Sequence, residues 1–267
     1  MYGLYICPDI DIAMYTLAGI ANRAKGWGIH GDTFTVIRQI GNLGEEAWFQ
    51  LGDRDLATCL LRTQQLKIGR TLTQVTAWLC KRFGVKQMIV PPTDHQVETH
   101  ITMKGKEIHL QEFWVRYGGR VVVRGVKYVG ARRAKVTRQA RDAIMNADRI
   151  IICPGNPVTS ILPILAVGDF RRLMEYSRRK VVALSPMIGQ GSFSGPAPAL
   201  LKATGVEPTS LGVAKLYSDL LGEIIIHKVD SDQTSRIEAL GIACKAVDTE
   251  MKNNGDERRL AKFLVQH

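Results

Sequence analysis

The sequence predicts an α/β fold, a Rossmann-like and mostly parallel sheet with flanking helices, and two observations support that prediction. Strand-like and helix-like runs alternate through the second half of the chain, which is typical of βαβ units on a parallel sheet. Two of the strand-like runs, 149–154 and 180–185, each end in a glycine-rich turn. Loops at the carboxyl ends of neighbouring parallel strands share one crevice, and glycine lets the backbone approach a phosphate. The turns therefore predict a site for a nucleotide or another phosphorylated ligand.

Composition narrows the class of protein. The 267 residues are 45% hydrophobic and 23% charged, as in an ordinary soluble globular protein, and the net charge of +11 favours an anionic partner. The basic run 132–141 has no interleaved aromatic residue, so we expect no nucleic-acid partner. The five cysteines lie far apart, and no apolar run approaches the roughly 18 residues of a membrane span. We expect a cytoplasmic protein with reduced, mostly buried thiols and no membrane contact.

The first third of the chain is predicted to be helical. Apolar residues recur at three-to-four spacing in four segments, 9–21, 32–43, 55–67 and 73–83. Three of these segments begin at an aspartate that can cap a first turn, namely Asp9, Asp32 and Asp55. A doubly wound fold usually opens on a strand and a glycine-rich turn, whereas this sequence opens on a loop and a helix. We therefore expect one nucleotide-binding domain over 1–267 whose first βα unit is missing.

A small β-rich insertion is predicted at about 88–130. Residues 98–103 and 107–117 form a hairpin pattern, and 121–129 is rich in β-branched residues. Along the 107–117 strand, Glu112, Trp114 and Arg116 would share one face. That face either holds a planar heterocycle or is a half-buried tryptophan with a surface ion pair.

The rest of the chain alternates in the order expected of a parallel sheet. After a helix that ends at Asn146 we expect a strand at 149–154, helices at 158–166 and 169–178, a strand at 180–185, helices at 197–204 and 209–221, a strand at 223–229, a helix at 232–240, a strand at 243–247 and a helix from about 256.

Two carboxylates, Asp9 and Asp11, lie in the first turn of the first predicted helix. One interpretation is a helix cap with a favourable charge at the positive end of the helix dipole. The other is a Mg²⁺ site, because Mg²⁺ takes a few hard oxygen ligands and leaves positions for water and phosphate. The residues alone leave both interpretations open.

Four further residues before and after predicted helices have two interpretations each. Arg54 either pairs with Asp53 or meets a phosphate or an aromatic ring, which suits a guanidinium. Thr93 and Asp94 either form a turn closed by the aspartate or present a hydroxyl and a carboxylate to a ligand.

The two glycine turns carry the remaining candidates. In the first, Gly155, Asn156 and Pro157 follow a strand and Ser160 lies at the start of the next helix, so an amide can contact a base or ribose and the helix start can hold phosphate. The alternative is an ordinary βα turn. The second turn, 189–196, contains Gly189 and Gly191 and is similar to a phosphate cradle, but it fits neither the dinucleotide motif nor the P-loop motif.

Several long segments together resemble the 2-phospho-L-lactate transferase family. The strings LGDRDLAT and QEFWVRY are the most specific of them. The segments are 3–11, 14–19, 26–28, 48–58, 92–94, 111–117, 155–161 and 247–251.

The resemblance implies a cytoplasmic, Mg²⁺-dependent and homodimeric transferase with a Rossmann-like core, which acts in the biosynthesis of the deazaflavin coenzyme F-420. Such enzymes move a phospholactyl or phosphoenolpyruvyl group from a guanosine diphosphate adduct to the ribityl hydroxyl of the deazaflavin precursor FO and release GMP. Carried onto this sequence, the resemblance gives Mg²⁺ to Asp9 and Asp11 as catalytic residues. It gives the guanosine diphosphate part to Asn156 and the two glycine loops. It assigns binding of FO to Arg54, Thr93 and Trp114. The neighbouring residues Asp53, Asp94 and Arg116 are further substrate-binding candidates.

Two parts of the family pattern are absent from the sequence. One is the glycine-rich opening unit, and the other is a basic residue in the second glycine loop, where serines stand at 192 and 194. An alternative function is a non-catalytic regulatory protein on the same scaffold that binds a nucleotide or a nucleotide sugar. That protein would be stabilised by its ligand without turnover.

Overall fold

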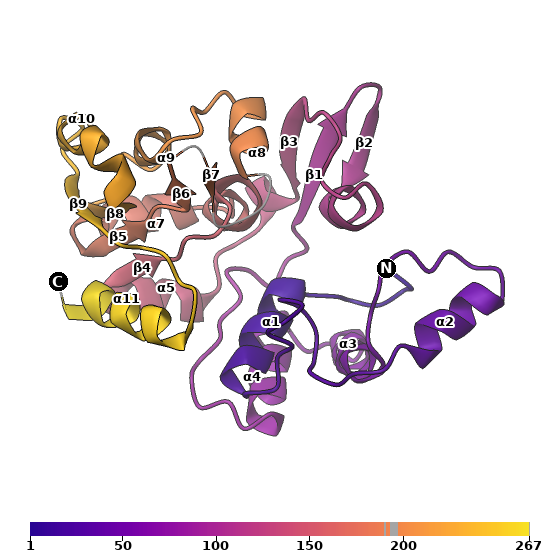
Figure 1. Cartoon of the computed structure of the whole chain (residues 1–267). Coiled ribbons are helices and arrows are strands. Elements are labelled where there is room, and N and C mark those ends of the chain that lie inside the picture. The colour runs from indigo at the N-terminus through magenta and orange to yellow at the C-terminus, as the bar shows by residue number, and fades with distance from the viewer. Residues whose placement is uncertain (190, 193–196, 267) are drawn as a thin grey trace. The chain divides into compact units, whose positions relative to one another are not determined.

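A computed structural model describes residues 1–189, 191–192 and 197–266 (Figure 1). The chain divides into two compact units. The first consists of Met1–Asp94 with Gln111–Gly118, and the second consists of His95–Leu110 with Gly119–His267. Within the described residues, no helix has both the length and the apolar character to cross a membrane. All five cysteines are free thiols, of which Cys59 and Cys80 are buried and Cys153 is exposed.

The first unit is built from four helices, close to the predicted segments. They are α1 (Pro8–Leu17), α2 (Thr35–Asn42), α3 (Asp53–Lys67) and α4 (Leu72–Arg82). Met14 and Tyr15 on α1 pack in one core cluster with Val75 and Leu79 on α4. A second cluster joins Ile37, Phe49, Leu51 and Cys59, so α2 and α3 enclose the segment between them.

The helix starts in this unit are capped differently from the prediction. Asp32 does not begin α2; its carboxylate accepts hydrogen bonds from two backbone N–H groups in the first turn of α3, at 3.0 and 3.1 Å. Asp53, the first residue of α3, in turn accepts two N–H groups in the first turn of α2, both at 3.0 Å. Asp9 caps nothing, because α1 begins without a side-chain cap. The two helices therefore exchange their caps, and each aspartate ties one helix start to the other.

The predicted strand at 107–117 is wrong beyond His109. Glu112–Arg116 is a π-helical turn, so Glu112, Trp114 and Arg116 do not line one face of a strand. Phe113 in this turn is only 1% exposed, and the turn belongs to the first unit rather than to the hairpin before it. Burial of Phe113 overrides the local alternation, which is a weak determinant of strand structure.

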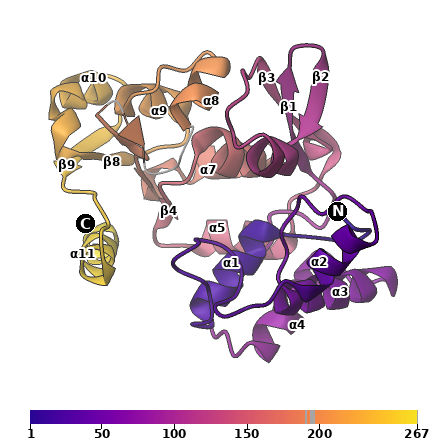
Figure 2. The same cartoon turned by 45° about the vertical axis from the view of Figure 1, so that its right-hand side comes forward.

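The second unit contains the predicted β-rich insertion as a three-stranded antiparallel sheet, β2-β1-β3, whose strands lie side by side in both views (Figure 2). Its strands are β1 (Glu98–Met103), β2 (Lys106–His109) and β3 (Gly125–Val129). The predicted strand at 121–129 is therefore shortened to its second half.

The main sheet of the second unit confirms the α/β prediction. Four parallel strands lie in the order β4-β5-β8-β9, and β4 and β5, which precede the two glycine turns, are neighbours. The strands are β4 (Ile150–Ile152), β5 (Val181–Leu184), β8 (Glu223–His227) and β9 (Ala243–Val247). The helices are α5 (Arg138–Asn146), α6 (Leu162–Leu165), α7 (Phe170–Tyr176), α8 (Ala197–Ala203), α9 (Ser210–Leu216), α10 (Thr234–Glu238) and α11 (Asn254–Gln266). Leu260 and Leu264 of α11, yellow in Figure 1, pack on Leu184 and Ile225 of the sheet.

The second glycine turn differs from the predicted βα turn. After β5 the chain forms a short antiparallel hairpin of β6 (Met187–Ile188) and β7 (Gly191–Ser192) before α8 begins. Gly189 lies at the tip of this hairpin with a φ of +56°, a conformation that glycine adopts without strain. The rest of the predicted cradle, residues 190 and 193–196, lies outside the described residues.

Candidate functional site

The first unit contains a cavity of about 310 Å³, which is within the size range of small-molecule pockets, about 300–1,000 Å³. Its walls come from the first turns of α1 and α3, from the loops before α2 and α3, and from the π-helical turn. The aromatic and polar residues that line it are Tyr15, Trp27, Phe49, Asp11, Gln50, Asp55 and Gln111. A ligand with a flat apolar body and a few hydrogen-bonding edges fits such a lining.

Asp11 in the cavity wall forms a buried ion pair with Arg62. Arg62 on α3 is fully buried and its Nη1 donates to Asp11 Oδ2 at 3.0 Å, while its Nη2 donates to Asp11 Oδ1. Nη1 also donates to the carbonyl of Tyr5 at 3.3 Å. Arg62 was not among the residues predicted from the sequence. It was detectable, because it lies four residues after Thr58 and three after Cys59 on the buried face of α3, where an arginine needs a partner.

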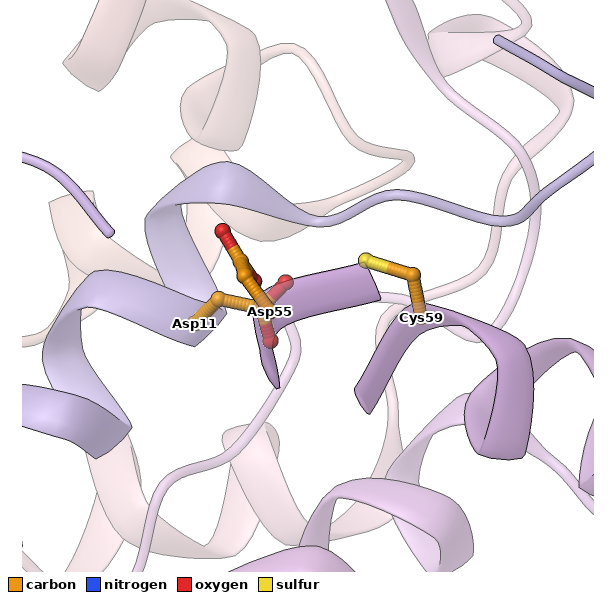
Figure 3. A group of neighbouring side chains, drawn as sticks. All are labelled: Asp11, Asp55 and Cys59. Atoms are coloured by element: carbon orange, nitrogen blue, oxygen red, sulfur yellow. The ribbon is translucent and has the colours of Figure 1, made fainter. Parts of the chain in front are cut away.

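Asp55 faces Asp11 from the first turn of α3 (Figure 3). The hydroxyl of Tyr15 donates to Asp55 Oδ1 at 2.8 Å. Burial raises the pKa of Asp55 to about 6, and the hydrogen bond from Tyr15 only partly offsets this effect. Asp55 is therefore a carboxyl group that changes charge close to neutral pH, in a cavity wall.

A metal ion has one group of candidate ligands among the described residues, namely Asp11, Asp55 and Cys59, whose ligand atoms lie within 4.8 Å of one another. This group does not suit Mg²⁺. Burial raises the pKa of the Cys59 thiol to about 12, so the thiol is neutral, and sulfur is too soft a ligand for Mg²⁺. Both oxygens of Asp11 are already bound by a guanidinium cation. Asp9 is exposed and does not belong to the group.

The predicted residues next to the helix starts have structural partners. Asp94 accepts hydrogen bonds from the N–H and the hydroxyl of Thr73 at 2.7 and 2.8 Å, which neither interpretation of the sequence included. It thereby adds an acceptor in the first turn of α4, which Thr71 and Gln74 already cap. Thr93 beside it is buried. Arg54 does not pair with Asp53; its Nη1 donates to the carbonyl of His30 at 3.3 Å.

The π-helical turn contributes to the cavity through residues other than the predicted ones. Gln111 and Val115 line the cavity, whereas Trp114 and Arg116 do not. Trp114 packs edge-on against Phe113, and Arg116 forms an ion pair with Glu46 at 3.2 Å. Because the turn is helical, Gln111 and Val115 share the side that faces the cavity, and Trp114 and Arg116 point elsewhere. Trp27, from the segment that resembles the transferase family, is a wall residue that the sequence analysis did not single out.

In the second unit, the first glycine turn keeps a free donor. Asn156 Oδ1 accepts the N–H groups of Val158 and Thr159 at 3.0 and 3.4 Å, so the side chain caps the turn that begins at Pro157. Asn156 is only 4% exposed, and within the described residues its Nδ2 has no hydrogen-bond partner. A buried donor without a partner costs stability unless a ligand or water accepts from it.

The close packing of this turn explains its glycine. A Cβ on Gly155 would lie 3.2 Å from the Cβ of Ser160, which is tighter than ordinary contact. Ser160, in the π-helical turn Pro157–Ile161, therefore lies directly against the glycine turn, and its substrate contact stays a prediction.

An amide of the second glycine turn is hydrogen-bonded within the protein. The N–H of Gly189 donates to Asp230 Oδ2 at 3.2 Å, and the buried Asp230 also accepts from the hydroxyl of Ser210 and from Gln233, both at 3.2 Å. Gly191 pairs with Ile188 in the hairpin. In this structure the N–H of Gly189 is therefore already hydrogen-bonded to Asp230, and the substrate contact of Gly189 and Gly191 stays a prediction.

The candidate residues divide between the two units. The candidates up to Asp94, together with Trp114 and Arg116, belong to the first unit, and those from Gly155 onward belong to the second. The fold and the site define a Rossmann-like α/β protein that also contains a helical unit with an aromatic and acidic cavity. A family model described as 2-phospho-L-lactate transferase CofD matches residues 1–263. The chain belongs to this 2-phospho-L-lactate transferase family.

Relatives with two different names match nearly the whole chain. A phosphoenolpyruvate transferase of Streptomyces coelicolor is 39% identical over 98% of this chain and 84% of its own length. A 2-phospho-L-lactate transferase of Methanospirillum hungatei is 40% identical over 98% of this chain and 86% of its own length. A crystal structure of a UPF0052-family protein from Bacillus halodurans matches with a TM-score of 0.54 at 15% identity, covering 95% of each chain, which shows a common fold.

Proposed function

We propose that this chain transfers a phospholactyl or phosphoenolpyruvyl group from a guanosine diphosphate adduct to the ribityl hydroxyl of the deazaflavin precursor FO and releases GMP, in the biosynthesis of coenzyme F-420. The observation that carries the proposal is the cavity of the first unit. It combines aromatic walls at Tyr15, Trp27 and Phe49 with carboxyl groups, which suits a tricyclic heterocycle with polar edges. The names of the relatives support the same reaction class, with either a phosphoenolpyruvyl or a phospholactyl group transferred.

The two units have complementary roles in this proposal. The cavity of the first unit receives FO, and the carboxyl edge of the parallel sheet in the second unit receives the donor, with Asn156 Nδ2 as a hydrogen-bond donor to it. The charge distribution favours this division. The second unit contains 25 basic and 16 acidic residues, a net charge of +9, whereas the first unit contains 11 and 9. A basic unit attracts a phosphorylated donor.

Catalysis in this proposal depends on positioning. Phosphoryl transfer needs reactants in line and compensation of the charge on phosphate, with little covalent chemistry from the protein. In the first unit, Arg62 fixes the carboxylate of Asp11, and Tyr15 fixes Asp55, so both acids are held in place in the cavity wall. These contacts orient the polar part of FO without a rearrangement at the moment of reaction.

We also propose that the enzyme is a cytoplasmic homodimer and that turnover requires Mg²⁺. Because the buried acids do not suit Mg²⁺, the ion would be held mainly by the diphosphate of the donor, and Asp9 on α1 remains a candidate carboxylate ligand. Chelation followed by addition of Mg²⁺ tests this requirement, and sedimentation of the whole chain tests the dimer. Turnover that persists unchanged after chelation would exclude the Mg²⁺ requirement, and a monomer in sedimentation would exclude the dimer.

The test of the function is a coupled measurement of GMP release with FO and each of the two guanosine diphosphate adducts. Trp27→Ala should raise the KM for FO at least tenfold and leave the KM for the adduct unchanged. Trp78 is the matched control, because it packs under Arg82 away from the cavity. Trp78→Phe should therefore leave both constants unchanged.

A second variant examines the donor side. Asn156→Asp keeps the oxygen that caps the turn but loses the free amide donor, so the fold should persist while the KM for the adduct rises. If no GMP forms with either adduct but the adduct still raises the melting temperature, the chain is a binding protein and the transferase proposal fails. That outcome would support the regulatory alternative.

A further inference from the structure

Trp27, a wall residue of the large cavity, also borders a second cavity in the first unit. Trp27 and Gly28 line the large cavity of about 310 Å³. The same two residues line a smaller cavity of about 120 Å³, together with Lys25 and Phe34 among others. Trp27 is 42% exposed, so burial in the core does not hold its ring. Whatever fixes this ring therefore sets the width of the cavity assigned to FO.

Two neighbouring side chains hold the ring of Trp27. The ring of Phe34 meets it edge-on, with centroids 6.1 Å apart. The ammonium group of Lys25 lies over both rings, 5.1 Å from the centroid of Trp27 and 4.6 Å from that of Phe34. A cation within about 6 Å of an aromatic face is attracted to it, so Lys25 ties the two rings together. Lys25 and Phe34 line the small cavity and not the large one, so they act on the large cavity only through Trp27.

The backbone around Lys25 forms a closed loop. Asn22 Oδ1 accepts the N–H of Lys25 at 3.1 Å, and the carbonyl of Asn22 accepts the N–H of Gly26 at 2.9 Å. The N–H of Asn22 donates to the carbonyl of Gly28 at 2.9 Å, which joins the two ends of the loop. Gly26 and Gly28, on either side of Trp27, have φ of +73° and +69°, a conformation that glycine adopts without strain. The loop therefore fixes the backbone from which Lys25 and Trp27 extend.

We propose that Lys25 is a positioning residue for the acceptor, because its ammonium group holds the ring of Trp27 in the wall of the large cavity and out of the small one. This inference rests on the proposed function, since it takes the large cavity as the site of FO. An exposed cation–π contact changes an equilibrium constant by a factor of about two to five. Lys25 does not line the large cavity, so its effect falls on the binding of FO and not on the chemical step.

The experiment measures FO binding to the full chain and its variants by equilibrium dialysis, together with the kinetics of GMP release. Lys25→Met keeps a long side chain without the charge. It should weaken FO binding about two- to fivefold and raise the KM for FO by the same factor, with kcat and the KM for the adduct unchanged. Lys25→Arg should bind FO as the parent does, because a guanidinium also stacks on aromatic rings. Lys86→Met is the matched control and should change nothing, because Lys86 is an exposed lysine of the same unit that lines neither cavity.

A double-variant cycle separates positioning of the ring from a general effect of charge. In a Trp27→Ala background, Lys25→Met should weaken FO binding no further, because the ring that Lys25 holds is gone. An equal loss in both backgrounds would overturn the inference, as would unchanged FO binding in Lys25→Met.

The same measurements distinguish failure of this inference from failure of the proposed function. If the parent does not bind FO, or if Trp27→Ala leaves FO binding unchanged, the large cavity is not the FO site and both proposals fail. If FO binding responds as expected but no GMP forms, the transfer reaction fails while the role of Lys25 is supported.

Discussion

Substitution of Gly52 by alanine should destabilise the first unit by breaking the exchanged caps. Gly52 has φ −68° and ψ 156°, which any residue adopts, so only space decides the outcome. An added Cβ would lie 2.2 Å from Asp32 Oδ2 and 2.5 Å from Cγ. Asp32 would have to leave the N–H groups that it caps at the start of α3, which lie at 3.0 and 3.1 Å. A lost cap costs about 0.5–2 kcal/mol and overpacking about 1–3 kcal/mol, so we expect a loss of about 2–4 kcal/mol.

Urea unfolding followed by tryptophan fluorescence measures this loss, because all four tryptophans belong to the first unit. Gly41→Ala is the matched control. Gly41 lies inside α2 and its Cβ would meet only the Cβ of Ala47, at the ordinary distance of 3.6 Å, so we expect no loss and a gain of up to about 1 kcal/mol. In an Asp32→Ala background, Gly52→Ala should cost much less, since the clash with Cγ and Oδ2 is gone and only the contact with the Cβ of residue 32, at 3.0 Å, remains. If Gly52→Ala costs no more than Gly41→Ala, the argument from the caps is wrong.

Three further outcomes follow from the hydrogen bonds of Asp55, Tyr15 and Asp94. Folding raises the pKa of Asp55 to about 6, so protonated Asp55 favours the folded state below about pH 4, and this contribution is lost as pH rises through 6. The urea midpoint should therefore be higher at low pH by this contribution, and Asp55→Asn should remove that part of the pH dependence. Tyr15→Phe removes the 2.8 Å hydrogen bond, so NMR titration should find the pKa of Asp55 higher still, with a stability loss of about 1 kcal/mol. Asp94→Ala should cost about 0.5–2 kcal/mol in the same urea measurement because the N–H of Thr73 in the first turn of α4 loses its acceptor, although the capping box of Thr71 and Gln74 remains; an unchanged midpoint would show that water replaces Asp94.

Most helices and parallel strands could be predicted from the sequence because their signal is local. Each strand of the main sheet is a short apolar run, and the helices between them repeat apolar residues every three to four positions, so burial and periodicity agree. The segment with Glu112, Trp114 and Arg116 failed because its alternation is short. Anchoring of Phe113 in the first unit determines its conformation.

The candidate site was predictable in its segments but not in its side-chain contacts. The sequence indicated Asp11 and the residues around Asp55, yet it missed Arg62, whose partner Asp11 lies 51 positions away. It also gave no sign that Asp230, 41 positions away, accepts a hydrogen bond from the amide of Gly189. Hydrogen bonds of this range are not encoded in any local pattern.

The sequence by itself determined the α/β class, the parallel order of elements after Arg138, the family and the segments that carry its site, because each of these depends on residue type and near spacing. Only the tertiary structure decided which acids are free and which are bound: Asp11 to Arg62, and Asp32 and Asp53 to each other's helices. The physical reason is that a buried or capping charge takes whichever partner the packing of distant segments brings within hydrogen-bond distance.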